Sequence, residues 1–447
     1  FIVGGAVVVF VSFLLVLPRA VGPEAAADVE SSHREEAPPP ASRIGASIAA
    51  LVLLLLMLSG WAGSQEPGEN IISTAFWLLI WVVMPISCAL LGNWTATVNP
   101  FAGLARLADR DAVRRRLLGG PAVRWPDWLG WWPSVILFFV VATGELVFNA
   151  LATVPRVTAW GLLAYALLSA AGGVIVGADA WLARGEIFSV LFGTWGRLGL
   201  FRFGAPGPRG FGGGLRAPFE PSVSRITFVL LLLVSVSFDG LLTTDAWRSA
   251  RGHLPLGIAP GTAPYLALTT MALVVLLLVA WALFGGFAAA VRAVGRMPHS
   301  VIQVLAGLLP SLLPIALGYL IAHNAEYIAI NGQLLIPLAG NPAGLGWHLL
   351  PAPFDDSYAI NANILPSGVV WYLQVALIIG VHIAAVVMAH RFLGRAARTV
   401  GLARRSEAPW VIAMVAYTMT SLWLLAQPLV EEGVTAALRW STALLRA

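Results

Sequence analysis

Long apolar segments with almost no charge recur along this chain and restrict its fold more than any other feature. A helix needs about 20 mostly apolar residues to cross the hydrocarbon core of a bilayer. Ten segments approach that length, and the first of them is expected to be incomplete. They are 1–18, 44–63, 71–92, 133–153, 157–180, 226–242, 264–291, 301–322, 367–390 and 410–430. The pattern predicts an all-α, polytopic integral membrane helix bundle of about ten transmembrane helices, folded as one transmembrane domain.

The composition excludes several other classes of protein. Only 11% of the 447 residues are charged, whereas soluble domains have about 25%. The basic residues are all Arg, so a phosphate-binding loop of the GxxxxGK type cannot form. These Arg residues are spread over short connections, which argues against nucleic acid as a partner. The single cysteine, Cys88, lies within a predicted span, so no internal disulfide is expected.

The distribution of Arg predicts the orientation, because short cytoplasmic loops are enriched in basic residues. With 19–43 inside, the inner connections 19–43, 93–132, 181–225, 292–300 and 391–409 carry 22 Arg, against five in the outer segments. We therefore expect a multi-pass protein of the bacterial cytoplasmic (inner) membrane, with 323–366 as an extracytoplasmic loop.

The chain opens on an apolar run without Met or a basic leading region, so we expect a truncated start rather than a signal peptide.

Two connections predicted to be cytoplasmic, 93–132 and 181–225, have segments of their own. In the first, Leu and Val alternate with Arg between Leu104 and Leu117, which is typical of a basic amphipathic helix on the inner leaflet. The second begins with the apolar stretch 184–192, which is too short to span a membrane and is predicted to be interfacial or re-entrant. It continues into the Gly- and Pro-rich segment 204–214, a flexible loop.

Four ionisable residues lie within or at the end of predicted spans, all towards the outer side: Glu145, Asp239, His323 and Glu326. Such residues are costly at membrane depth, so each is a candidate for function. His323 and Glu326 share one helical face. A His and a carboxylate at that spacing can ligate one divalent metal ion, with Glu145 and Asp239 as further ligands from facing helices. The alternative is that each acid bonds to a neighbouring helix or reaches the lipid headgroups.

The other histidines need separate explanations. His382 lies well inside a span, in its inner half, where a proton relay would suit its near-neutral reference pKa. A bond to a neighbouring helix is the alternative. His390 shares its helical face about 12 Å away, too far for the two to hold one haem. In the outer loop, His348, Asp355 and Asp356 either cover the outer site or are simply solvated.

Several motifs resemble a group of bacterial multi-pass membrane proteins that carry the label "fenitrothion hydrolase". These motifs are Pro314-x4-Tyr319-x2-Ala322-His323-Asn324, Gln333, Gly346-Trp347, Trp371-Tyr372-x-Gln374, Val381-His382, Ala389-His390, Gly92-Asn93-Trp94-x4-Asn99-Pro100, Gly185-Glu186-x2-Ser189 and Ser237-Phe238-Asp239-Gly240. The resemblance implies hydrolysis of a phosphotriester. Such chemistry commonly uses a metal to generate hydroxide, and the outer-side His and acids would be its ligands.

The sequence leaves three functions open. The first is a permease-like protein or a membrane-complex subunit that handles a small polar solute, an ion or a proton, because Glu145, Asp239 and His382 lie within spans. The second is a membrane-embedded metal-dependent hydrolase with a site on the outer side. The third is a structural or assembly role. The lipid bilayer and further membrane-complex subunits are the partners we expect.

Overall fold

The computed structural model describes residues 2–16, 42–204, 207–254, 258–355 and 357–425. Within these ranges the regular structure is helical, apart from one isolated bridge between Phe201 and Pro208. The prediction of an all-α polytopic helix bundle is confirmed. The ends of the predicted spans at 1–18 and 410–430 lie partly outside the described residues.

Eight helices in the described ranges are long and apolar enough to cross a membrane. They are α3 (Arg43–Ala62), a continuous helix from Ile71 to Leu91, α10 (Pro155–Val176), α13 (Val223–Leu242), α15 (Ala263–Gly295), α16 (Val301–Asn331), α18 (Ser367–Ala396) and α19 (Val400–Leu425). The predicted spans 1–18 and 133–153 correspond to the shorter helices α1 (Ile2–Val16) and α8 (Trp132–Leu146). The count of ten spans therefore stays a prediction.

Local sequence signals begin these helices. Ser300 and Gln303 form a reciprocal capping box at the start of α16. The Asn70 side chain accepts from the Ile72 amide where the Ile71–Leu91 helix begins. That helix consists of α4 (Ile71–Ser73), a π-helical stretch (Thr74–Val83) and α5 (Met84–Leu91).

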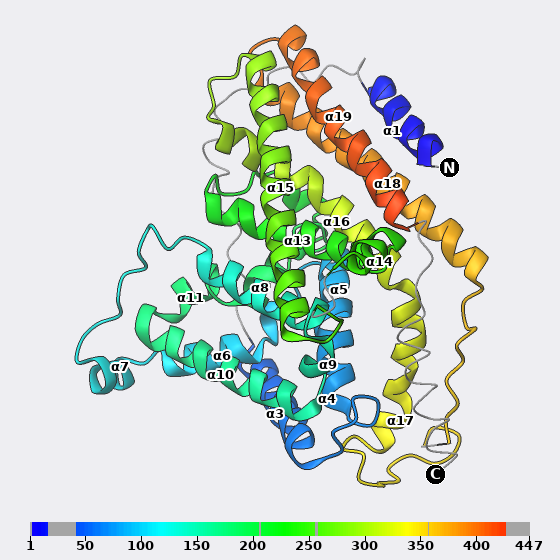
Figure 1. The fold of residues 1–447 in the computed structure, drawn as a ribbon. Helices are drawn as coiled ribbons and strands as arrows, with labels where there is room; N and C mark the ends of the chain where they lie inside the picture. Colours follow the sequence, from blue (N-terminus) through cyan, green and yellow to red (C-terminus); the bar gives the residue numbers. More distant parts are fainter. Residues whose placement is uncertain (1, 17–41, 205–206, 255–257, 356, 426–447) are drawn as a thin grey trace.

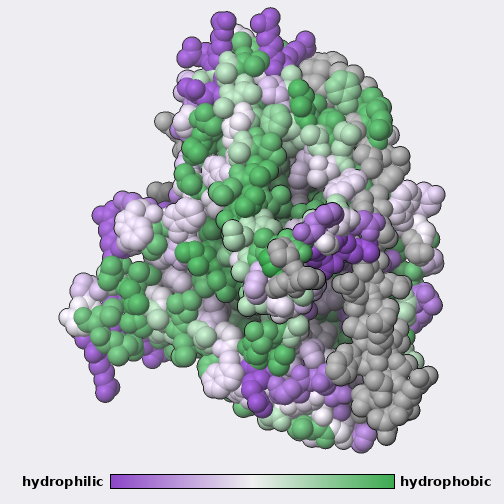
Figure 2. All heavy atoms as spheres, viewed as in Figure 1, coloured by the Kyte–Doolittle hydropathy of each residue, from purple (hydrophilic) through white to green (hydrophobic). Residues whose placement is uncertain are grey.

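The helices form two groups that meet at α13 and the Ile71–Leu91 helix (Figure 1). In the N-terminal group, α3 and α6 (Pro100–Ala108) pack against α10; in the C-terminal group, α15, α16, α18 and α19 pack together. In their most apolar stretches, 94% of the α16 residues and 72% of the α13 residues are buried, against 17% for α15. Thus α13 and α16 are central. Apolar side chains cover the face along which α15 runs, as Figure 2 shows, which suits contact with lipid.

Connections that are predicted to share one side of the membrane bond to each other. The Ser42 amide donates to the Thr97 carbonyl at 3.2 Å, and both belong to predicted inner segments. The Ser64 amide donates to the Ala343 carbonyl at 2.8 Å, and both belong to predicted outer segments. The contacts agree with the predicted alternation, but without a membrane in the structure the orientation stays a prediction.

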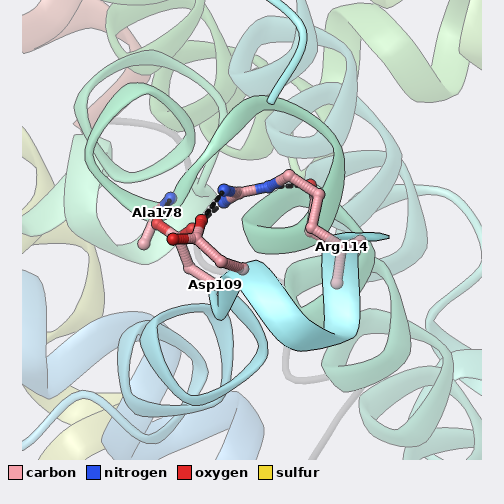
Figure 3. A network of polar contacts seen from close by, with 5 residues as sticks. Asp109, Arg114 and Ala178 are labelled. Carbon is pink, nitrogen blue, oxygen red and sulfur yellow. Dashed lines mark hydrogen bonds and ion pairs between the residues drawn. The ribbon is translucent and has the colours of Figure 1, made fainter. Parts of the chain in front are cut away.

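The basic segment predicted on the inner leaflet folds as α6 and α7 (Asp111–Leu118), and Arg114 holds it to the bundle (Figure 3). The buried Arg114 guanidinium contacts Asp109 and donates to the Val174 carbonyl at 3.0 Å. Asp109 also accepts from the Ala178 amide at 2.8 Å, at the start of α11 (Ala178–Arg184). Residues 115–118 remain exposed, as expected of an interfacial segment.

The apolar stretch predicted as interfacial or re-entrant forms α12 (Ile187–Gly196). Eight of its ten residues are buried, and the helix packs against α5, α8 and α11. Burial inside the bundle favours the re-entrant alternative.

Gly173 permits the close approach of α10 and α6, and its replacement is expected to destabilise the protein. A Cβ at position 173 would overlap the Ala105 carbonyl, whereas a Cβ at Gly161 on the same helix has open space around it. We expect Gly173→Ala to cost about 1–3 kcal/mol through overpacking. Gly161→Ala is the matched control and should be neutral or stabilising by up to about 1 kcal/mol, since Ala is the better helix former.

A thiol-reactive fluorogenic dye can measure this effect, because Cys88 is the single cysteine of the chain and is buried. Labelling on heating in detergent then reports unfolding. Equal unfolding midpoints for Gly173→Ala and Gly161→Ala would contradict the proposed close contact.

Candidate functional site

A cavity of about 50 Å³ lies where the two helix groups meet. Its lining includes Trp81 from the π-helical stretch, Glu145 from α8, Trp195 from α12, Asp239 from α13 and Asn324 from α16. At roughly 10–15 Å³ for each water molecule the space holds a few waters. It is far smaller than the roughly 300–1,000 Å³ of typical small-molecule sites. The cavity is thus a small, partly acidic space made by five separate elements.

His323 and Asp239 pair across the interface of α16 and α13 beside this cavity. The His323 Nε2 atom lies 2.8 Å from Asp239 Oδ2. The Asp239 side chain is 35% exposed and that of His323 12%, so Asp239 is the member of the pair that opens to the surroundings. The Tyr319 ring stacks on the imidazole, with 5.9 Å between ring centres. The Tyr319 hydroxyl packs against Gly240, in space that a Cβ at position 240 would occupy. These contacts fix the position of the His323 ring.

Glu145 enters the same cavity from the last turn of α8. It accepts a hydrogen bond from Trp81 Nε1, and the Trp81 ring stacks on Phe138 of α8 at 5.3 Å between ring centres. Trp81 belongs to the π-helical stretch. Such turns are rare and frequently occur at functional sites. The π-helix therefore places the donor that holds the Glu145 carboxyl.

Three of the five predicted site residues are thus brought together: Glu145, Asp239 and His323. Glu326 lies one turn beyond His323, because α16 continues to Asn331. Among the described residues, no ion pair links Glu326 to the other three. The i,i+3 spacing correctly placed His323 and Glu326 on a helix, but His323 pairs with a different helix instead.

The predicted metal set of His323, Glu326, Glu145 and Asp239 is not assembled in this structure. In the described part of the chain, no three or more His, Cys, Asp or Glu side chains are grouped so that they could hold a metal ion. The physical reason is that His323 directs its Nε2 atom to Asp239 of another helix and not to Glu326. Metal binding at these residues gains no support from the geometry.

His382 is fully buried in α18 and does not line the cavity. Its Nδ1 lies 2.8 Å from the Ile378 carbonyl of its own helix, so the predicted bond to a neighbouring helix is not seen at this atom. Its Nε2 is buried without a hydrogen-bond partner in the described structure. The ring centre lies 6.1 Å from that of Tyr417, whose hydroxyl bonds to Ser237 Oγ at 2.7 Å. Tyr417 therefore lies between His382 and the helix that carries Asp239.

The outer-loop candidates do not reach the site. His348 is exposed, and Asp355 accepts hydrogen bonds from the Ser357 hydroxyl and amide. Bonding from the Ser357 side chain and backbone lowers the pKa of Asp355. Asp356 lies outside the described residues.

Two segments of the proposed resemblance have a structural explanation. Asn99 accepts from the Phe101 and Ala102 amides and so caps α6. Its amide group donates to Glu186 at 2.8 Å, and Glu186 in turn caps α12. Helix ends within a protein need such acceptors for their free amides, so these residues hold α6 and α12 together.

Sequence reasoning missed Trp81 and Glu407. Nothing in an apolar run reveals that one tryptophan donates to Glu145. Glu407 was assigned to the Arg-rich connection 391–409, but α19 begins at Val400 and the residue is 2% exposed. It pairs with His390, whose Nδ1 lies 2.9 Å from Glu407 Oε1. A carboxylate three residues before Trp410 at the start of an apolar run was the available signal.

Comparisons of the chain with protein-family models, with curated proteins and with solved structures found no match. The resemblance to the proteins labelled "fenitrothion hydrolase" therefore rests on the motifs alone. The class that the fold defines is a polytopic membrane protein, and its function has to be argued from the site.

Proposed function

We propose that this membrane protein passes protons, or a small cation, through the junction of its two helix groups, with Glu145, Asp239 and His323 as the exchange site. The observation that carries the proposal is the meeting of Glu145 and Asp239 at one cavity, with His323 of a third helix paired to Asp239 beside it. Ionisable residues inside a membrane domain commonly mark ion pathways and proton relays.

The size and charge of the cavity favour a proton or a small cation over a larger solute. About 50 Å³ accommodates a few waters. The site has two carboxyl groups and one imidazole, so its acidic groups outnumber its basic group. Such a site attracts a cation and can also bind and release protons, since carboxyl and imidazole groups both exchange them.

The position of the site also supports transport. Transporters commonly bind their ions where two helical units meet. Here α8, α13 and α16 bring the acids and the imidazole to the boundary between the N-terminal and C-terminal groups. The Asp239 side chain is 35% exposed, so the pair is not sealed from its surroundings. A subunit of a larger membrane complex could use the same site, whereas no geometry in the described residues favours the hydrolase alternative.

Replacing Glu145 with glutamine tests the proposal in proteoliposomes. The protein is reconstituted with the pH-sensitive dye pyranine trapped inside, and a potassium diffusion potential drives protons inward. The amide cannot exchange a proton, so we expect Glu145→Gln to reduce proton flux by roughly 100-fold, the scale on which a positioned acid–base group contributes. Replacing external sodium with choline separates a proton from a sodium ion as the species moved.

Glu66→Gln is the matched control, because Glu66 is an exposed acid on the side predicted to be outer and lies outside the cavity. It should keep wild-type flux. The proposal fails if wild-type vesicles are no more permeable than protein-free vesicles to protons and to sodium, or if Glu145→Gln behaves like Glu66→Gln.

A further inference from the structure

A second acid–base pair, His390 and Glu407, lies buried between α18 and α19, away from the cavity described above. The His390 Nδ1 and Glu407 Oε1 atoms are 2.9 Å apart, and the side chains are 7% and 2% exposed. The mutual attraction of two such groups often fails to recover the free energy lost when they are removed from water. A contribution to the stability of the fold is therefore a poor explanation for the presence of this buried pair.

Glu407 also has an unsatisfied atom. Its Oε2 is buried and has no hydrogen-bond partner in the described structure. A cavity of about 10 Å³ lies beside the pair, lined by His390, Glu407, Trp410 and Met414 among others. This volume is at the lower limit for one water molecule. Buried polar atoms are usually paired with protein or water, so the orphaned oxygen marks a place where a proton or a water can enter.

Further polar groups lie between this pair and Asp239. On α19, Glu407, Trp410 and Tyr417 are spaced three and seven residues apart and so share one face. The Trp410 Nε1 donates to Ser311 Oγ of α16 at 3.2 Å. The hydroxyl of Tyr417 bonds to Ser237, which lies two residues before Asp239.

On α18, His382 has its ring 6.1 Å from that of Tyr417 and its Nε2 without a partner in the described structure. It lies about 12 Å along the helix from His390. Figure 1 shows α18 and α19 side by side over this length. The interface of α16, α18 and α19 therefore carries protonatable groups at both ends, with hydroxyl groups and an imidazole between them.

We propose that His390 and Glu407 form a second proton-exchanging site, which exchanges protons with the Asp239 site by way of His382 and Tyr417. The inference rests on the proposed function. In its neutral state the pair holds one proton, either on Glu407 or on His390 with Glu407 ionised. When that proton leaves towards His382, the pair keeps one negative charge. A proton taken up from the side of the exposed Arg391 restores it.

Infrared difference spectroscopy and proton flux test the site and the path separately. Spectra of the purified protein are compared between about pH 9 and about pH 5, a range wide enough to include displaced carboxyl groups. We expect Glu407→Gln to remove one carboxylic-acid carbonyl signal. His390→Gln should keep that signal but move its pH midpoint. In proteoliposomes both variants should lose flux by roughly 100-fold, as expected for loss of an acid–base group.

Ser406→Ala is the control, because it changes a buried hydroxyl next to Glu407 whose one hydrogen bond within the described residues is to Ala403 of its own helix. It should leave spectra and flux unchanged. An unchanged carboxyl spectrum in Glu407→Gln and His390→Gln overturns the site. Loss of flux in Glu145→Gln but not in Glu407→Gln or His390→Gln overturns the path. If wild-type protein shows no flux and Glu407→Gln still loses its carboxyl signal, the proposed transport fails and the second site stands.

Discussion

Asp239→Asn is expected to reduce proton flux more than any other single change at the cavity, by 100-fold or more on the scale of roughly 100 to 10,000-fold for positioned acid–base groups. Asp239 combines two properties. Its carboxylate lines the cavity and pairs with His323 Nε2 at 2.8 Å. With 35% of its side chain exposed, it is also partly open to the surroundings. Glu145→Gln removes a carboxyl but leaves this pair intact.

The pairing with His323 predicts non-additive effects. Residues that act as one unit lose most of their function when either is removed, and a second removal adds little. We therefore expect His323→Gln to lower flux as well, and Asp239→Asn with His323→Gln together to be no worse than Asp239→Asn alone. Flux in pyranine-loaded proteoliposomes measures all three variants under the same imposed potential.

Asp245→Asn is the matched control for this series. It removes a carboxyl on α14 (Asp245–Gly252), just after α13, where the exposed Asp245 pairs with Arg248 at 2.5 Å. It should keep wild-type flux. If the losses from Asp239→Asn and His323→Gln multiply in the double variant, the two residues act independently, and the ion pair is not the working unit.

The fold could be predicted from the sequence to the extent that apolar length decides it. Segments such as 264–291 and 301–322 predicted α15 and α16. An apolar run of this length is long enough to cross a bilayer, and a helix satisfies its backbone hydrogen bonds there. The limits of the method appear at α8. Its apolar run continues past residue 150, but the helix ends at Leu146 and a separate short helix, α9 (Asn149–Ala152), follows. Interruptions of a helix of this kind depend on packing, which hydropathy does not encode.

The site was predictable in composition but not in pairing. Ionisable residues are costly at membrane depth, and this singled out Glu145, Asp239 and His323. In the structure Glu145 and Asp239 line one cavity, and His323 pairs with Asp239 beside it. Sequence spacing suggested that His323 works with Glu326, since it compares residues on one helix only. The true partner, Asp239, depends on how α13 and α16 are rotated against each other. Trp81 was missed for the same reason, because its contact with Glu145 joins two helices. Glu407 was missed because it lies among Arg residues that were assigned to a connection.

Glu186→Ala is expected to give the largest loss of stability of any change considered for this protein. Glu186 is completely buried. Its carboxylate accepts from the Phe188 and Ser189 amides, from Asn99 Nδ2 and from the Tyr165 hydroxyl. Removing it leaves four donors without their acceptor where water cannot easily replace it. Each buried donor left without an acceptor costs about 1–3 kcal/mol, so we expect a total loss of at least about 3 kcal/mol.

The size of the loss should follow the number of donors left unpaired. Glu186→Gln keeps one acceptor oxygen, so it should lie between Glu186→Ala and the wild type. Ser42→Ala removes an exposed cap, in which Ser42 Oγ accepts from the Gly45 amide at 3.1 Å, and should cost only about 1 kcal/mol. Labelling of Cys88 during unfolding in mixed micelles orders the three variants. If Glu186→Ala unfolds no more easily than Ser42→Ala, the network does not hold α6 to α12. The structural explanation of the Asn99 and Glu186 segments would then be lost, and a role in function would become the better account of both.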